Sequence, residues 1–141
     1  MKNNFSVKDS FEVNIYNNND FMLPPASGSA GYKRMVIIPC SMKTLGMIAN
    51  GIASNLMCRA ADVILKEGGT LVVVPRETPL SVVHLENMLR LKKAGGILLP
   101  ASPAFYNKPE NIDELVDFVC GKVMSALGIS TGIIKPWGMY E

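Results

Sequence analysis

The stretch Met35-Val-Ile-Ile-Pro-Cys-Ser-Met-Lys-Thr44 decides the fold class of this chain. Its first four residues are apolar, and they end at a proline that is followed by the polar residues Ser41 and Lys43. The same change recurs where Leu71-Val-Val-Val74 runs into Pro75-Arg-Glu-Thr-Pro79. In open α/β sheets, ligands bind beyond the carboxyl ends of the strands. These two strand ends are therefore where a binding site is expected.

Short apolar runs alternate with helical patterns from residue 34 onward. Residues 35–38, 71–74 and 97–99 are predicted to form parallel strands, and helices are expected over 43–50, 54–67, 81–94 and 112–127. In the last helix, apolar residues recur at spacings of three and four, Asn111 or Pro109 marks the start, and Gly128 follows the end. Strands that alternate with helices predict a three-layer α/β sheet.

The composition narrows the class of protein. A chain of 141 residues suits one domain, and 48% hydrophobic with only 18% charged residues favours strands buried on both faces, an oligomer interface, or both. A net charge of +2 without a basic tract argues against nucleic acid as a partner. Three cysteines without CxxC spacing favour reduced thiols in the cytoplasm. No secretory signal is expected, and no apolar run approaches the roughly 20 residues that cross a membrane.

The first 30 residues differ from the rest. Asn17-Asn-Asn-Asp20 and Pro24-Pro-Ala-Ser-Gly-Ser29 are typical of turns and loops, and residues 11–16 are a weak strand candidate. We therefore expect an irregular segment over residues 1–30 and a domain over residues 31–141.

Polar residues after the first strand are candidates for binding an anion. Ser41, Met42, Lys43 and Thr44 lie where a helix begins, so unpaired backbone N–H groups, two hydroxyls and an ammonium group could hold a phosphate. Alternatively, Ser41 only caps the helix. Cys40 could be a nucleophile, but no paired histidine is evident.

Further candidates follow the second and third strands. Arg76 offers a planar donor fork and Glu77 can transfer a proton, although a solvated turn or a surface ion pair is the alternative. Tyr106 either donates a hydrogen bond to a ligand or covers the edge of the core. Lys122, at the border of the last helix's apolar stripe, either extends to water or neutralises an anion.

Two other groups are interpreted as structural from their spacing. Arg59, Asp62 and Lys66 share one helix face and predict a ladder of surface ion pairs. His84 has no partner at metal-ligand spacing, and no set of metal ligands is visible.

Five segments in order resemble the flavin prenyltransferase (UbiX-type) family. They are Pro39-Cys-Ser-Met-Lys-Thr-Leu45, Arg59-Ala-Ala-Asp-Val-Ile-Leu-Lys-Glu67, Pro75-Arg-Glu-Thr-Pro79, His84-Leu-Glu-Asn-Met-Leu89 and Pro103-Ala-Phe-Tyr106. Ala26-Ser-Gly-Ser29 and Lys135-Pro-Trp137 are also similar to this family. The resemblance runs from about Asp20 to Trp137.

The resemblance implies a Rossmann-like or flavodoxin-like parallel sheet and a specific reaction. FMN would receive a dimethylallyl group from dimethylallyl phosphate, and the prenylated FMN would serve a separate UbiD-type decarboxylase. By motif, Ser41 to Thr44 and Arg76 would contact FMN, and Tyr106 and Lys122 would bind the donor phosphate. Arg59 and Lys66 would help across a subunit boundary, and Glu77 would assist proton transfer or phosphate departure. No metal is implied, and family members form homo-oligomers, commonly dodecamers.

The sequence also departs from the family's pattern. The family begins with a strand and a glycine-rich loop that cradles the FMN phosphate, and this chain shows no such βαβ unit. We therefore expect the chain by itself to bind FMN weakly. Two alternatives stay open: a non-catalytic truncated subunit that retains the oligomer surface, and an FMN-dependent cysteine decarboxylase of the same fold class. The Pro-Arg-Glu-Thr-Pro and Pro-Ala-Phe-Tyr segments argue against the second alternative.

Overall fold

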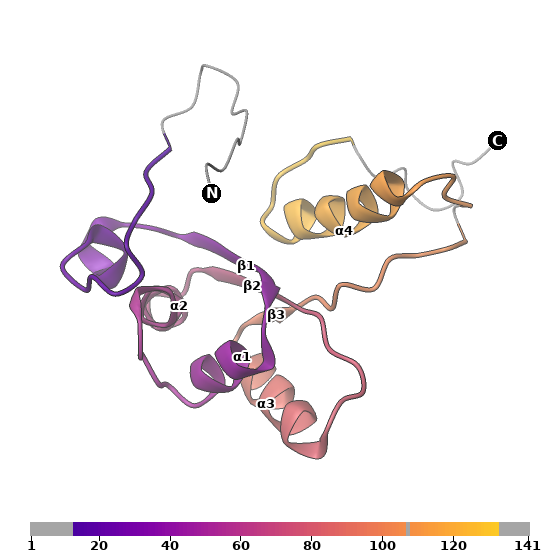
Figure 1. The fold of residues 1–141 in the computed structure, drawn as a ribbon. Coiled ribbons are helices and arrows are strands. Elements are labelled where there is room, and N and C mark those ends of the chain that lie inside the picture. The colour runs from indigo at the N-terminus through magenta and orange to yellow at the C-terminus, as the bar shows by residue number, and fades with distance from the viewer. Residues whose placement is uncertain (1–12, 107, 133–141) are drawn as a thin grey trace.

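The computed structural model describes residues 13–106 and 108–132. Its centre is a parallel sheet of three strands, β1 (Arg34–Cys40), β2 (Thr70–Pro75) and β3 (Ile97–Leu98), with β2 in the middle (Figure 1). The three predicted strands are confirmed, and the third is one residue shorter than expected. Among the described residues, no strand pairs with the other edge of β1.

Four α-helices cover the two faces of this sheet. They are α1 (Met42–Ala49), α2 (Leu56–Lys66), α3 (Val82–Lys93) and α4 (Ile112–Ala126). The first three lie on one side of the sheet and α4 lies on the other (Figure 1). The predicted three-layer α/β arrangement is confirmed.

Each helix begins at a polar side chain that satisfies an otherwise unpaired backbone group. Ser41, Asn55, Ser81 and Asn111 each accept a hydrogen bond from the backbone N–H three residues later. After α4, Gly128 adopts a φ of +73°, which is strained for residues with a side chain. These local signals explain why the predicted helix boundaries lie within two residues of the observed ones.

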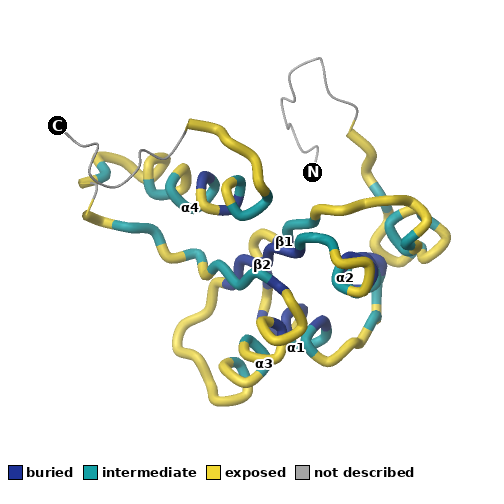
Figure 2. Tube along the Cα trace, turned by 180° about the vertical axis from the view of Figure 1, so that it is seen from behind, coloured by how far each residue is buried: buried dark blue, intermediate teal, exposed yellow. Residues whose placement is uncertain are grey.

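The strands separate the core into two clusters because successive side chains point to opposite faces of a sheet. On the face that α1, α2 and α3 cover, Leu71 and Val73 pack with residues such as Leu45. On the α4 face, Val72 and Val74 pack with Val123. In Figure 2 the buried colour is concentrated in β2 and in the inner sides of α1 and α2, whereas α4 is mostly intermediate or exposed.

The segment before β1 contains two short 3-10 turns, η1 (Pro24–Ala26) and η2 (Gly28–Ala30). The weak strand candidate is wrong for residues 13–16, which form no strand, and residues 11 and 12 lie outside the described part of the chain. Asn17 and Asp20 instead hold this segment in turns through hydrogen bonds from the N–H groups of Asn19 and Met22. No helix in the described ranges is long and apolar enough to cross a membrane.

Candidate functional site

The carboxyl ends of all three strands meet at one edge of the sheet. Cys40 pairs with Pro75 in the register of β1 and β2. On the other side of β2, the N–H of Ala101 donates a hydrogen bond of 3.0 Å to the carbonyl oxygen of Pro75. The residues that follow the strands, Ser41 and Arg76, therefore begin next to each other. The sheet brings together the polar strand ends that the sequence singles out.

At the end of β1, Ser41 has the structural role that was one of its two interpretations. Its Oγ accepts a hydrogen bond of 3.2 Å from the N–H of Thr44 and donates one of 3.1 Å to the Thr44 hydroxyl. Ser41 and Lys43 are exposed, whereas Met42 and Thr44 are buried. The cap leaves the first N–H groups of α1 without partners within the helix, so they can still meet an anion.

Arg76 and Glu77 are both exposed at the end of β2. Within the described residues they form no ion pair with each other; the Glu77 carboxylate accepts a hydrogen bond of 3.1 Å from the N–H of Thr78. The alternative of a mutual surface pair is therefore wrong. The guanidinium group of Arg76 and the carboxylate of Glu77 remain available to a ligand at the sheet edge.

The Cys40 thiol is unsuited to nucleophilic chemistry near neutral pH. Burial, with a smaller contribution from the charge of Cys58, raises the pKa of Cys40 from 9.0 to about 11. Burial also raises the pKa of Cys58. The Cys40 Sγ donates a hydrogen bond of 3.4 Å to the carbonyl oxygen of Ser41. Because the thiolate is the nucleophile, a thiol that stays protonated belongs to the core.

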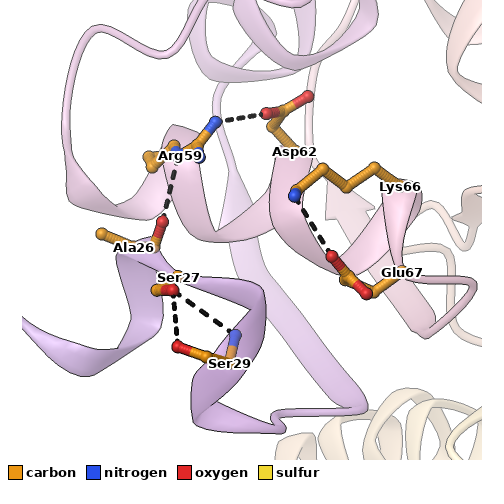
Figure 3. Close-up of polar contacts among 7 residues, drawn as sticks. All are labelled: Ala26, Ser27, Ser29, Arg59, Asp62, Lys66 and Glu67. Carbon is orange, nitrogen blue, oxygen red and sulfur yellow. Dashed lines mark hydrogen bonds and ion pairs between the residues drawn. The ribbon is translucent and has the colours of Figure 1, made fainter.

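The candidate cations of α2 already have polar partners on α2, at its C-terminal end and in the η1–η2 segment beside it (Figure 3). Arg59 donates to Asp62 at 2.9 Å and, through Nε, to the carbonyl oxygen of Ala26 at 3.1 Å. Lys66 pairs with Glu67 at 3.1 Å. The predicted ion-pair ladder is confirmed for Arg59 and Asp62, but Lys66 turns to its chain neighbour instead of joining it.

Ser27 and Ser29 lie beside these residues and bring more hydroxyl groups to them (Figure 3). Their hydroxyl oxygens are 2.8 Å apart, and Ser27 caps η2 by accepting from the N–H of Ser29. The backbone of Gly28 lies so close to the carboxylate of Glu67 that a Cβ atom on Gly28 would force this flexible side chain to move. The Ala26–Ser29 segment is thereby fitted against the end of α2.

On the opposite side of the sheet, Tyr106 and Lys122 contact the same aromatic ring. The ring of Tyr106 meets that of Phe118 edge to face, with centroids 6.3 Å apart and an interplanar angle of 89°. The Lys122 Nζ lies 5.5 Å from the centroid of the Phe118 ring. Tyr106 is 56% exposed and belongs to neither core cluster, which favours the interpretation that it meets a ligand over the interpretation that it covers the core edge.

Within one chain, the structure separates the residues that the resemblance assigns to the donor phosphate. Arg59 and Lys66 lie on α2, and Lys122 lies on α4 across the sheet (Figure 1). Phe118, which links Tyr106 to Lys122, was missed by sequence reasoning. Its spacing of four residues from Lys122 on one helix was the available signal.

The other sequence candidates are resolved more simply. His84 is structural, as predicted: its Nδ1 accepts from the N–H of Ser81 at 3.3 Å and completes a capping box at the start of α3. No group of three or more metal-ligating side chains occurs within the described ranges. The Lys135-Pro-Trp137 motif lies outside the described residues.

The sheet, together with the hydrogen-bond donors at its carboxyl edge, defines an α/β protein with a ligand site beyond its strand ends. The family model described as Flavoprotein matches residues 4–124. Flavin prenyltransferase UbiX of Methanocaldococcus jannaschii is 50% identical over 126 residues, which cover 89% of this chain and 68% of that protein. At this identity and coverage, the chain belongs to the flavin prenyltransferase family.

Solved structures agree with this assignment. The dodecameric FMN-dependent UbiX-like decarboxylase from Escherichia coli O157:H7 matches with a TM-score of 0.83 and 48% identity, covering 86% of this chain and 66% of that one. AnUbiX (PadA1), solved in complex with FMN and dimethylallyl pyrophosphate, matches with a TM-score of 0.86 and 44% identity, covering 89% and 67%. The flavodoxin-like fold is thus confirmed, and the chain spans about two thirds of the length of these relatives.

Proposed function

We propose that this chain takes part in flavin prenylation, the transfer of a dimethylallyl group from dimethylallyl phosphate to FMN. The observation that carries the proposal is the meeting of Tyr106 and Lys122 on one ring, in a chain 44% identical to a protein solved with FMN and a dimethylallyl donor. A hydroxyl and an ammonium group that contact the same ring are both donors that suit a phosphate.

The carboxyl edge of the sheet fits FMN. Ser41, Lys43 and the first N–H groups of α1 offer donors for its polar groups, and Arg76 adds a guanidinium group at the neighbouring strand end. The buried side chains of Met42 and Thr44 keep that end of the helix in place. When bound, FMN supplies the ring that accepts the dimethylallyl group.

The roles of the remaining candidate residues follow from the charge that the reaction places on the donor phosphate. As the bond between the donor's carbon and oxygen breaks, the phosphate leaves with the electron pair, and cations stabilise it. Lys122 and Tyr106 would hold this phosphate, and Glu77 would accept the proton lost from the flavin or deliver one to the phosphate. Arg59 and Lys66 would join only after exchanging contacts with Asp62 and Glu67 for the donor.

We further propose that the site is completed by another copy of the chain. Support comes from the placement of Arg59 and Lys122 on opposite faces of the sheet, and from the dodecameric E. coli relative. The outer surface of α3 is also unusually apolar: Val82 and Val83 are 70% and 62% exposed, and Leu85 and Leu89 are 50% and 55% exposed. Light scattering of the purified chain measures the oligomer, and a monomer would contradict this proposal.

The cellular setting is proposed on chemical grounds. Cys40, Cys58 and Cys120 are all free thiols, which suits a reducing cytoplasm. The prenylated FMN product would be delivered to a UbiD-type decarboxylase.

A substitution of Glu77 tests the reaction. Glu77→Gln should keep FMN bound, because the change removes a charge and not a flavin contact, and should slow formation of prenylated flavin by roughly 10²- to 10⁴-fold. The rate is followed by the absorbance change of the flavin after dimethylallyl phosphate is added. Glu110→Gln, at an exposed glutamate in the loop before α4, is the matched control and should leave the rate unchanged.

Two results would contradict this proposal. Product formed at the parental rate by Glu77→Gln would remove Glu77 from the mechanism. A parent chain that assembles into an oligomer but holds no FMN and forms no product would favour the non-catalytic subunit instead.

A further inference from the structure

Phe118 lies in α4 but is not a core residue. The buried clusters on the two faces of the sheet include Val119 and Val123 from this helix, and neither cluster includes Phe118. Phe118 is half-buried at the border of the apolar stripe, four residues before Lys122 and therefore on the same side of the helix. Its ring instead contacts Tyr106 and Lys122.

Both contacts of the Phe118 ring match the charge distribution of an aromatic ring, whose faces are negative and whose edges are positive. The Lys122 ammonium lies over the ring, 5.5 Å from its centroid, as in a cation–π interaction. Tyr106 meets the same ring at 89°, which is the favoured edge-to-face geometry. One ring thus fixes a residue from the loop after β3 and a residue from α4.

Without this ring, the Lys122 side chain could take up other positions. Its side chain also lines a groove of about 580 Å³ formed by the end of α4 and the residues after it, including Gly121, Ser125 and Gly128. A lysine has a flexible four-carbon stem, and holding such a side chain still costs free energy when a ligand binds. A ring that contacts both the ammonium group and Tyr106 restricts the positions of that side chain and so reduces that cost.

We propose that Phe118 is a positioning residue that holds Lys122 and Tyr106 ready for the donor phosphate. The inference rests on the proposed function, since it names the residue that prepares the same phosphate site. Phe118 does not touch the reacting atoms, so its loss should raise the KM for dimethylallyl phosphate and leave kcat at saturating donor nearly unchanged.

The experiment compares three variants of the full chain loaded with FMN. Phe118→Leu keeps an apolar side chain but removes the ring, and should weaken dimethylallyl phosphate binding by roughly 3- to 10-fold in calorimetry. Phe118→Tyr restores a ring and should return affinity to within about 2-fold of the parent. Phe105→Leu, the same change at a 70% exposed aromatic in the neighbouring loop, is the matched control and should leave donor affinity unchanged.

A second readout needs no donor. The ring should shift the NMR signals of the Lys122 side-chain methylene protons upfield, and Phe118→Leu should abolish this shift while Phe118→Tyr retains it. Lys122→Arg identifies the signals. This measurement reports the contact itself, whatever the chain binds.

The outcomes separate the two proposals. Loss of the ring shift together with a raised KM in Phe118→Leu, rescued by Phe118→Tyr, supports the positioning role. Unchanged donor affinity after the shift is lost, or an equal loss in Phe105→Leu, overturns it. If the parent shows the ring shift but binds no dimethylallyl phosphate, the proposed function fails, and the positioning role for this donor fails with it.

Discussion

Both faces of the sheet carry cationic side chains, but the groups that surround these cations differ between the two faces. On the side of α1, α2 and α3, a deep core includes Leu45, Leu71 and Leu91 at 0% exposure, and the cations of α2 are neutralised by Asp62 and Glu67. On the side of α4, the fully buried cluster is small, and Lys122 contacts a ring and pairs with no carboxylate of the described residues.

This difference suggests different roles for the two faces of the sheet. The charge of a cation that is paired with a carboxylate is largely cancelled at a distance. A cation that lies over a neutral aromatic ring is not neutralised, so it still attracts an incoming anion. The helix that covers this face, α4, is mostly intermediate or exposed along its length (Figure 2). We infer that the α2 face provides the rigid frame and that the α4 face meets the donor first.

Removing the cation of the α4 face should have the largest effect. Lys122→Ala should weaken dimethylallyl phosphate binding by roughly 10- to 100-fold, because a lost charged hydrogen bond costs about 1.5–3 kcal/mol. FMN binding should change little. Lys92→Ala, an exposed lysine of α3, is the control. Equal donor affinity in the parent and in Lys122→Ala, measured by calorimetry, would remove Lys122 from the phosphate site.

An alkaline pH should weaken the deep core of the other face. The folded chain keeps the Cys40 proton up to a pKa of about 11, whereas the unfolded chain releases it near 9.0. The stability from this thiol is therefore fully present below pH 9.0 and is lost as pH rises through about 11. The free energy of unfolding should fall by about 1.4 kcal/mol between pH 8 and pH 10 from this group alone.

Urea denaturation at the two pH values measures this loss, and variants isolate the group responsible. Cys40→Ala should flatten the alkaline slope relative to the parent. Cys120→Ala should not, because Cys120 lies half-buried on α4 and not in the deep core. The same slope in all three proteins would show that the buried Cys40 thiol is not the group that titrates.

Breaking an ion pair on α2 should have the smallest effect. Arg59 and Asp62 are 37% and 41% exposed, so Asp62→Asn should lower the free energy of unfolding by only about 0.2–1 kcal/mol, and less at high salt. Asp117→Asn, on the exposed surface of α4, is the matched control. Donor affinity should stay or rise as Arg59 is released, and a large fall in affinity would contradict the division between the two faces.

Much of the fold follows from local signals. Ser41, Asn111 and Gly128 mark helix ends through hydrogen bonds and backbone angles that involve neighbouring residues, so sequence reasoning could locate them. The weak strand candidate before β1 failed because a strand needs a partner, and residues 13–16 pair with no strand in the described part of the chain. Turns held by Asn17 and Asp20 follow them directly.

The site was less accessible to sequence reasoning. Lys66 was placed correctly on the face of Arg59, but its choice of Glu67 over Asp62 depends on side-chain rotamers. Phe118 carries no motif signal, and its importance comes from Tyr106, which reaches it from a separate loop. The family resemblance grouped Tyr106 and Lys122 with Arg59 and Lys66 around one phosphate, without showing which of them share a face of the sheet.

By itself, the sequence determined the order of strands and helices, the helix caps and the apolar runs that make β2 the buried centre of the sheet. These depend on hydrogen bonds and burial preferences that act over a few residues. Only the tertiary structure decided that Arg59 and Lys66 lie across the sheet from Lys122, and that Tyr106 and Lys122 share the ring of Phe118. The physical reason is that a contact between distant segments depends on how helices pack onto the two faces of a sheet, and the packing of the whole domain sets that arrangement.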